Sequence, residues 1–541
     1  MKNANELFTE LSEHIFNKYL EMNPEAGNHL GLHEYDGKMS DNTLKGISEF
    51  VNESKLMLKK LSEINFSELS PENKFDYEIA KWGLESSVFE IEIMASHKKN
   101  PMHYAFMFGS LHNYISRNYA PFEERLKSVI QIIDKIPETL QTAEQILDKS
   151  LPEVLCKYAK QFSKGYENFF KDELLKEIKE KVKDEDLISE YVRKSDLAVQ
   201  AFAKFVVFLD KASSEENKSY ILGREKFEEM MKIKEHIDLP IDQIKKMGLA
   251  ELDRLQTSMK TLLKENDFED KLETLEHIHP SDENLISETS DMLTGLVDFI
   301  REKDIVDLPE KLNCIVIEMP KYMNFGFAAM GTAGPYEKSD ESFYYVNLPD
   351  SDWSVEKKEE WMTQFNYPTL KLISIHEAFP GHYTHFLNSN QHSTKLSKLF
   401  MSYSYVEGWA HYSEEMMVEE GYSKEDFKIR IGQLIEALIR CCRYLASISV
   451  HCENKSIEEV KDFFVKNAYM TETTAMQEAE RAAFDPGYLN YTLGKIYLKN
   501  FKKKYFAKYN GTKTLKDFHN MIVSMGCPTF RIAEKYALSN E

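Results

Sequence analysis

The segment that most constrains the fold and the chemistry of this chain reads Leu370-Lys-Leu-Ile-Ser-Ile-His376-Glu-Ala-Phe-Pro-Gly-His382-Tyr-Thr-His385. An apolar run leads directly into a His-Glu pair, and a second histidine follows. This order is typical of the helix that carries a metal-binding His-Glu motif. Histidines are also concentrated here, since five of the 16 in the chain lie between His376 and His411. We therefore expect a metal site on a helix in this part of the chain.

The spacing of the two histidines departs from the common H-E-x-x-H pattern, in which both rings lie on one helix face. Here the second histidine follows six residues after the first, which puts the rings about 240° apart around a regular helix and about 9 Å apart along it. Pro380 and Gly381 occupy the two extra positions. Proline removes a backbone donor, and glycine tolerates unusual backbone angles. We expect a bulge at Pro380-Gly381 that returns His382 to the metal side.

A third ligand is needed, because a catalytic zinc usually has three protein ligands and one open position. Glu407 is the natural candidate, since it follows His382 by 25 residues in a segment that reads as a second helix. His411 and Glu414 come four and seven residues later, so they share its helix face and could orient a ligand imidazole. The sequence thus predicts one Zn²⁺ per chain on His376, His382 and Glu407, although manganese or cobalt could occupy the same ligands.

Catalytic groups are expected beside this site and in a later segment, residues 481–494. Glu377, next to the first ligand, is expected to act as the general base on zinc-activated water and then to pass the proton to the leaving amine. Tyr488 or Tyr491 could donate a hydrogen bond to the developing negative charge. Arg481 could hold a substrate carboxylate or a nearby acid. For Arg481 and Tyr491, an ordinary role in helix packing remains equally open.

Two further histidines are candidates for substrate contact. His385 is expected to line the pocket or to donate to the oxyanion, and its position three residues after His382 leaves open that it replaces one ligand. His411 is the other candidate. The alternative to a metal site is a buried histidine cluster with carboxylate partners.

The bulk composition excludes several classes of protein. Lys plus Arg number 68 and Asp plus Glu 90, which gives a net charge of −22, so nucleic acid and anionic membranes are poor partners. The six cysteines include no CxxC pair, which argues against a disulfide framework or a thiolate zinc site. The first 20 residues lack the apolar core of a signal peptide, and no apolar run is long enough to span a membrane. We therefore expect a cytoplasmic protein, and its oligomeric state stays open.

The hydrophobic periodicity predicts a mainly α fold: a large helical protein with a small β-sheet beside the zincin-like active-site helix. Apolar residues recur at helical spacing through most of residues 1–300, as in Glu123–Ile136, Leu140–Asp148, Ile241–Lys264 and Asp282–Arg301. Short β-type runs follow at Cys314–Met319, Gly326–Gly331 and Ser342–Leu348. Helical periodicity returns from Val355 onward.

This change of pattern predicts two regions, which are free to share one core. Residues 1–300 would form the walls of a substrate groove, and residues 301–541 would form the catalytic, metallopeptidase-like region. A strand at the sheet edge, near Gly326–Met330 or Tyr344–Leu348, could bind an extended peptide by main-chain pairing.

At this point the chain resembles a known family, the bacterial "domain of unknown function 885" proteins. The matching blocks are His376–His382, Glu407–Glu414 and Pro486–Gly494, with a weaker match at Pro24–Gly31. The resemblance implies gluzincin-type zinc metallopeptidases, distantly similar to thermostable carboxypeptidases. It also implies a largely helical catalytic fold with zinc ligands at His376, His382 and Glu407 and a base at Glu377.

Two departures from the family pattern affect these roles. Tyr383 stands where the family commonly has a second histidine, which indicates that the adjacent histidine is not an essential ligand. Tyr488 stands where glutamine is frequent, which affects the expected substrate contacts more than the metal.

Together these features predict a zinc-dependent hydrolase that cleaves peptide bonds of short peptides. Two other classes stay open: a zinc hydrolase of non-peptide amides or esters, and a non-catalytic helical binding protein that keeps metal for structure. Glu377 argues against the last, because a structural site has no need of a base beside its ligand.

Overall fold

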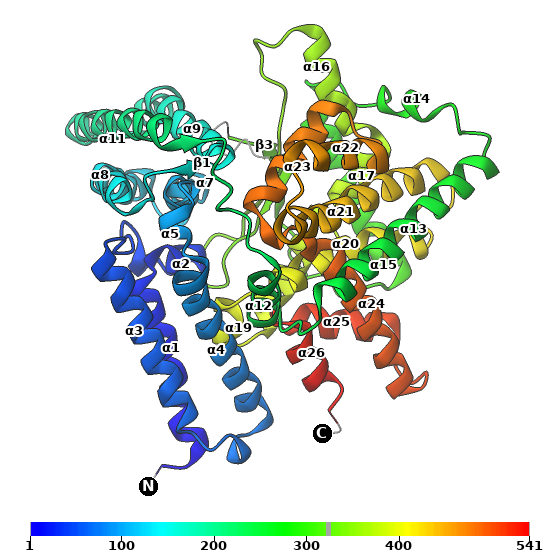
Figure 1. The fold of residues 1–541 in the computed structure, drawn as a ribbon, viewed down its shortest axis with the longest axis horizontal. Coiled ribbons are helices and arrows are strands. Elements are labelled where there is room, and N and C mark those ends of the chain that lie inside the picture. Colours follow the sequence, from blue (N-terminus) through cyan, green and yellow to red (C-terminus); the bar gives the residue numbers. More distant parts are fainter. Residues whose placement is uncertain (1, 321–325, 540–541) are drawn as a thin grey trace.

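The computed structural model describes residues 2–320 and 326–539 of the chain. Helices make up 72% of it and strands 3%, which confirms the predicted mainly α fold with one small mixed sheet. Figure 1 shows helices α1 to α11 gathered on one side of the molecule and most of the later helices on the other. The helices that connect or flank the groups described below are α2 (Pro24–His29), α7 (Leu111–Ser116), α10 (Leu174–Lys181), α14 (Leu272–Glu276), α16 (Val355–Met362), α22 (Ile457–Ala468), α23 (Glu472–Phe484) and α25 (Leu515–Ser524).

The N-terminal helices α1 (Ala4–Met22), α3 (Leu44–Ser62) and α4 (Pro71–Phe89) pack side by side, in blue in Figure 1. Thr43 and Ser70 cap α3 and α4 by accepting a hydrogen bond from a backbone N–H of the first turn. Their apolar faces form a core that also takes in residues of the C-terminal half, on α19 (Lys395–Leu399) and α26 (Phe530–Ala537).

A second group of helices lies next to the first and consists of α8 (Phe122–Ile146), α9 (Glu153–Asn168) and α11 (Glu185–Ala212). The two-residue strands β1 (Leu151–Pro152) and β2 (Ser213–Ser214) pair beside them. The sequence predicted two helices where α8 is one, because Pro137 interrupts the pattern. The helix continues through Pro137, since the buried side chains of Ile136 and Leu140 extend the same apolar face across it.

The other predicted helices are present as α13 (Ile241–Glu265) and α15 (Leu285–Lys303). The helices that carry the candidate site are α17 (Tyr367–Glu377), α18 (His382–His392), α20 (Tyr403–Glu419), α21 (Phe427–Glu453) and α24 (Asn490–Tyr509). α13 packs against α21, and α15 packs against α17. The largest apolar core joins residues 89–275 with residues 431–493. Helices from both sides of residue 300 therefore contribute to one core, and the division of roles between the two regions stays a prediction.

The small sheet has the strand order β3-β5-β4, with β3 (Cys314–Glu318) parallel and β4 (Ala328–Gly331) antiparallel to β5 (Ser342–Val346). All three predicted strands are thus confirmed. The interpretation of Tyr344–Leu348 as an edge was wrong, because β5 is the central strand and is buried along its whole length. β4, within the other predicted segment, does lie at an edge.

None of the helices in the described residues is both long enough and apolar enough to cross a membrane.

Candidate metal centre

The helix that carries the first histidine is interrupted between the two histidines. α17 ends at Glu377 and α18 begins at His382, and the Phe379-Pro380 peptide bond between them is cis. A Cβ at Gly381 would lie 1.8 Å from the carbonyl oxygen of His376, so only glycine fits this close approach. The Trp409 indole N–H donates to the carbonyl oxygen of Pro380 at 2.8 Å. The predicted departure from a regular helix is therefore confirmed, as a break of four residues, 378–381.

This break brings both histidines to one carboxylate. His376 Nε2 lies 3.4 Å and His382 Nε2 lies 3.5 Å from Glu407 Oε2, and the three ligand atoms all lie within 4.8 Å of one another. Ligand atoms about 2.0–2.1 Å from a tetrahedral zinc are about 3.3 Å apart, so the two separations between a histidine and Glu407 suit such an ion. In addition, Glu407 Oε2 is buried without a hydrogen-bond partner, as expected of an atom reserved for a metal.

Glu407 is in the charged form that a ligand requires. Burial by itself would raise the pKa of this carboxyl, but His382 and His376 opposite hold it below its usual range. When a carboxylate is ionised across the physiological pH range, protons do not compete with a metal ion for it. The residues present therefore fit a divalent cation.

Glu414 lies seven residues after Glu407 on α20. It fixes the orientation of the first candidate ligand, His376. Its carboxylate accepts from His376 Nδ1 at 2.7 Å and lies 3.2 Å from Arg440 Nη2. Burial opposes its charge, but Arg440 and His411 keep the pKa of Glu414 below its usual range. With its Nδ1–H donated to Glu414, His376 directs the Nε2 lone pair at the metal position. This confirms the expected contact between Glu414 and a ligand imidazole.

His411 and His385 lie away from the ligand cluster. His411 Nδ1 lies 3.3 Å from Glu414, and its side chain is fully buried behind the ligands; burial lowers its pKa to about 3. His385 is also fully buried, and its Nε2 lies 3.1 Å from the carbonyl oxygen of Gly526. The structure brings neither to an open surface, so their predicted substrate contacts are without structural support.

Glu377 is the last residue of α17 and is partly exposed. Within the described residues no hydrogen bond or ion pair engages its carboxylate, in contrast to Glu407 and Glu414. A carboxylate that is adjacent to a ligand and uncommitted can take up a proton from water.

Tyr491 is brought next to the ligands, whereas Tyr488 is not. The ring of Tyr491 stacks against that of His376 with 6.3 Å between centroids, and Arg481 Nη2 lies 3.4 Å from the Tyr491 hydroxyl. The Tyr488 hydroxyl instead donates a short hydrogen bond to Glu478 and is fully buried. Of the candidates for oxyanion stabilisation, Tyr491 alone has a position that suits the role.

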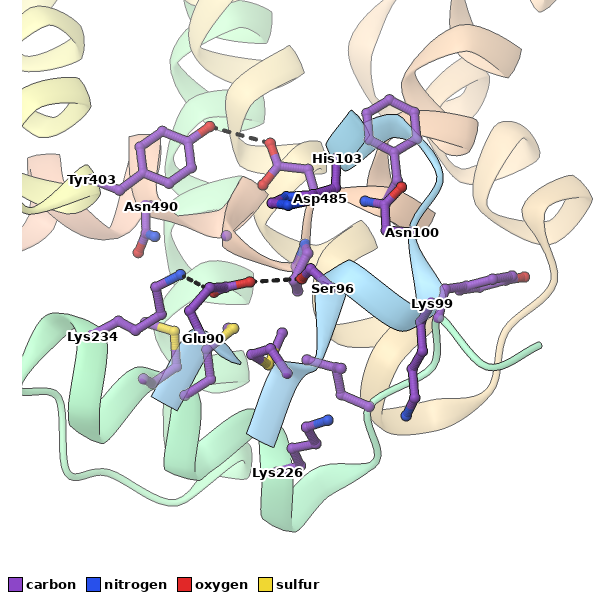
Figure 2. A pocket seen from close by; sticks show the side chains of 18 of the residues that line it. Glu90, Ser96, Lys99, Asn100, His103, Lys226, Lys234, Tyr403, Asp485 and Asn490 are labelled. Atoms are coloured by element: carbon purple, nitrogen blue, oxygen red, sulfur yellow. Dashed lines mark hydrogen bonds and ion pairs between the residues drawn. The ribbon is translucent and has the colours of Figure 1, made fainter. Parts of the chain in front are cut away.

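A cavity of about 740 Å³ lies next to this cluster (Figure 2). Its wall includes Tyr403 and Asp485, which share a hydrogen bond of 3.2 Å. The Tyr403 ring contacts the Tyr491 ring at 5.8 Å, and Asp485 lies 3.5 Å from Arg481. The cavity wall is therefore separated from the His376 ligand by two aromatic rings.

The sequence analysis missed Arg440 and Tyr403. Arg440 stands with Glu436 and Arg443 in the mainly apolar run Leu434–Leu445, and charged residues within a buried helix signal buried partners of opposite charge. Tyr403 carries no comparable signal, because its approach to Tyr491 depends on the packing of α20 against α24.

The fold and this site define a mainly helical protein in which two histidines and one carboxylate could hold a metal ion. The chain belongs to the family described as "Bacterial protein of unknown function (DUF885)", whose model matches residues 24–535. This confirms the family that the sequence motifs resembled.

Two solved structures share the fold along the whole chain. One, from Shewanella oneidensis, has a TM-score of 0.80 at 23% identity and covers 98% of this chain and 100% of its own. The other, from Colwellia psychrerythraea, has a TM-score of 0.85 at 15% identity, with 99% of each chain covered. Both are described as a "putative lipoprotein". No curated protein matches this chain significantly.

Proposed function

We propose that this protein is a zinc-dependent hydrolase that cleaves peptide bonds of short peptides. One observation supports the proposal: two imidazole nitrogens converge on a buried Glu407 oxygen that accepts no hydrogen bond, with all three atoms within 4.8 Å of one another. The uncommitted carboxylate of Glu377 beside them favours catalysis over a structural metal site, which needs no base.

In this proposal His376, His382 and Glu407 would hold the zinc ion. Zinc in such a site polarises a carbonyl group and acidifies a water molecule. A Glu377 carboxylate oxygen accepts the proton of that water and later donates it to the leaving nitrogen. The Tyr491 hydroxyl donates a hydrogen bond to the carbonyl oxygen as negative charge develops there, and Arg481 holds that hydroxyl in place.

The gluzincin-type character of the site is part of the same proposal. It is supported by the ligand types His, His and Glu, by the base at Glu377, and by the partner carboxylate Glu414 behind His376. Peptides are proposed as the substrate class because of the sequence resemblance and because of the cavity near the site.

The location of the protein is a separate proposal. The sequence led us to expect the cytoplasm, whereas the description of the two similar structures as lipoproteins favours a membrane-anchored location outside it. Fractionation of cells that express the native gene, followed by detection of the protein in the soluble and membrane fractions, decides between them.

The proposed hydrolase function is tested by measuring metal content and turnover in wild type and two variants. Wild type is expected to bind about one zinc per chain by mass spectrometry and to cleave members of a short-peptide library. His382→Ala is expected to lose zinc because one of three ligands is gone. Glu377→Gln is expected to keep zinc and to lose at least about 100-fold in turnover, because the proton acceptor is gone.

The outcomes separate the alternatives. Full turnover by Glu377→Gln, or a wild type that binds no supplied zinc, would overturn the proposal. Cleavage of non-peptide amides or esters with no cleavage of any peptide would replace the peptidase by the wider hydrolase class.

A further inference from the structure

The cavity beside the metal centre is built from distant parts of the chain. Its walls come from η3 (Glu90–Met94), α5 (Ser96–Lys99), α6 (Met102–Phe106), α12 (Arg224–Glu235) and the segment 483–490. Apolar side chains such as Trp82, Phe106 and Met231 contribute much of the lining. Its volume of about 740 Å³ is within the range of about 300–1,000 Å³ for pockets that bind small ligands.

The acidic side chains of this cavity are all engaged. Glu90 pairs with Lys234 at 2.8 Å. Glu235 accepts hydrogen bonds from the hydroxyls of Ser402 and Ser404, each at 2.6 Å. Asp485 is held by Tyr403 and Arg481, as described above. Each of these carboxylates therefore already has a hydrogen-bond or ion-pair partner.

Two lysines of the cavity, by contrast, have no partner. Lys99 and Lys226 are half-buried and form no ion pair or hydrogen bond with any residue in the described ranges. Burial, together with the charge of Lys99, lowers the pKa of Lys226. Two neighbouring cations without an ion-paired carboxylate stand out in a chain of net charge −22, where carboxylates are in excess.

The two lysines and Tyr403, the wall residue that leads toward the candidate metal centre, lie at opposite ends of the cavity. Figure 2 shows the ammonium groups of Lys99 and Lys226 at one end and Tyr403, Asp485 and Asn490 at the other. Tyr403 is in ring contact with Tyr491, which stacks on His376. A ligand that filled the cavity would thus place one end at Tyr403, two aromatic rings from His376, and the other at the lysines.

We propose that this cavity is the substrate subsite and that Lys99 and Lys226 bind a carboxylate at the end of the peptide remote from the cleaved bond. This inference rests on the proposed function, and it adds the substrate class: short peptides with an anionic end. The carboxylate comes either from the peptide C-terminus or from an acidic side chain. Both present the same pair of oxygens to the ammonium groups, and charge-assisted hydrogen bonds of this kind are the stronger ones in proteins.

Binding is measured by calorimetry in the full-length Glu377→Gln protein, in which cleavage does not obscure it. Three probes are N-acetylated tetrapeptides: tetra-alanine with a free carboxylate, tetra-alanine amide, and Ala-Ala-Ala-Glu amide. We expect at least one carboxylate peptide to bind about tenfold or more tightly than tetra-alanine amide, since about 1.4 kcal/mol corresponds to a factor of ten. Preference for the first identifies the terminal carboxylate, and preference for the third identifies an acidic side chain.

The lysines are then changed in the same background. Lys99→Ala with Lys226→Ala is expected to abolish the preference and to leave the affinity for the amide unchanged, whereas Lys226→Arg keeps the charge and should retain the preference. Lys232→Ala is the matched control, because Lys232 lies on the same helix, is exposed and pairs with Asp238 at 2.9 Å. A thermal unfolding curve of each variant shows that it is folded.

Equal affinity for all three peptides in the parent protein would overturn the inference, and so would a preference that survives the double substitution. Either result can coexist with efficient peptide cleavage by wild type, so the inference fails separately from the proposed function. Conversely, a protein that binds the carboxylate peptides through these lysines and hydrolyses nothing would uphold the subsite and refute the hydrolase.

Discussion

At the scale of single residues, the buried carboxylate of Glu414 fixes the orientation of the first candidate ligand, His376. Glu414 is fully buried and accepts from His376 Nδ1, while Arg440 and His411 balance its charge. A ligand imidazole that donates from its other nitrogen is fixed in tautomer and ring orientation. The affinity of the site for metal should therefore depend on a residue that does not itself face the metal.

Glu414→Gln tests this dependence. The amide keeps the shape of the side chain but removes the charge that stabilises the His376 Nδ1–H, so we expect zinc to bind about 10–100-fold more weakly. Competition with a chromophoric chelator measures the affinity. Glu419→Gln is the control, since Glu419 is at the end of the same helix and pairs with Lys499 at 3.4 Å. Equal zinc affinity in both variants would show that Glu414 has no influence on the site.

At the scale of elements, two glycines let α20 and α24 cross in close contact. A Cβ at Gly494 would lie 2.0 Å from the carbonyl oxygen of Ser404, and one at Gly408 would lie 2.7 Å from the Gly494 Cα. Glu407 precedes the first of these glycines, and Tyr491 is one helical turn before the second. The close crossing thus sets the positions of a metal ligand and of the expected oxyanion donor together.

Gly494→Ala is expected to lower the free energy of unfolding by about 1–3 kcal/mol, because the added methyl group meets backbone atoms that cannot move aside. Gly295→Ala is its counterpart on α15, where a Cβ would meet nothing within 4 Å. There we expect a gain of about 0.5–1 kcal/mol from helix propensity. Urea unfolding followed by circular dichroism measures both. A similar change of the same sign in the two variants would contradict the close-crossing argument.

A second junction between elements makes stability depend on pH. Burial raises the pKa of Asp76 on α4 to about 6, although the Thr394 hydroxyl at the start of α19 donates to it at 2.5 Å and lowers it somewhat. An unfolded aspartate has a pKa of about 3.9, so between about pH 4 and pH 6 the folded state binds more protons than the unfolded state. The contribution of Asp76 to stability is therefore complete below this window and is lost as the pH rises through it.

Asp76→Asn should remove this pH dependence, because the amide stays neutral and can still accept from Thr394. We expect the variant to match wild type near pH 4 and to be about 1–3 kcal/mol more stable above pH 6. Urea unfolding at several pH values from 4 to 7 measures the difference. Parallel pH profiles for the two proteins would show that Asp76 titrates in the folded state as it does in the unfolded chain.

At the scale of the whole molecule, a buried ion network joins the regions before and after residue 300. Lys495 on α24 is fully buried and lies 2.9 Å from Glu251 of α13 and 3.1 Å from Glu415 of α20. Arg254 and Lys499 complete the network. Removal of one member from a buried network leaves charges uncompensated, which costs far more than the loss of an exposed ion pair.

We therefore expect Lys495→Met to lower the free energy of unfolding by about 3–5 kcal/mol. Lys499→Met is expected to cost less than about 1 kcal/mol, because Lys499 pairs with the same Glu415 but is partly exposed. Chemical unfolding of the two variants beside wild type gives the comparison. Equal losses of unfolding free energy in the two variants would show that the removal of buried Lys495 costs no more than the removal of partly exposed Lys499.

The sequence by itself determined the features that depend on neighbouring residues. Helical periodicity predicted α13, α15 and α20, and β-type runs predicted the three strands. The Pro380-Gly381 insertion predicted a break in the helix, because these two residue types act on the backbone directly. Spacing along α20 placed Glu407 and Glu414 on one face.

The tertiary structure decided what depends on residues distant in the chain. The continuation of α8 through Pro137 and the central position of β5 follow from long-range packing, which local pattern does not encode. Arg440 behind Glu414 and the cavity between Lys99, Lys226 and Tyr403 join segments separated by tens to hundreds of residues. Local backbone preferences are set within a few residues, whereas contacts between elements depend on how whole apolar faces pack. For this reason the sequence could name the residues of the candidate metal centre, and only the fold could show what surrounds them.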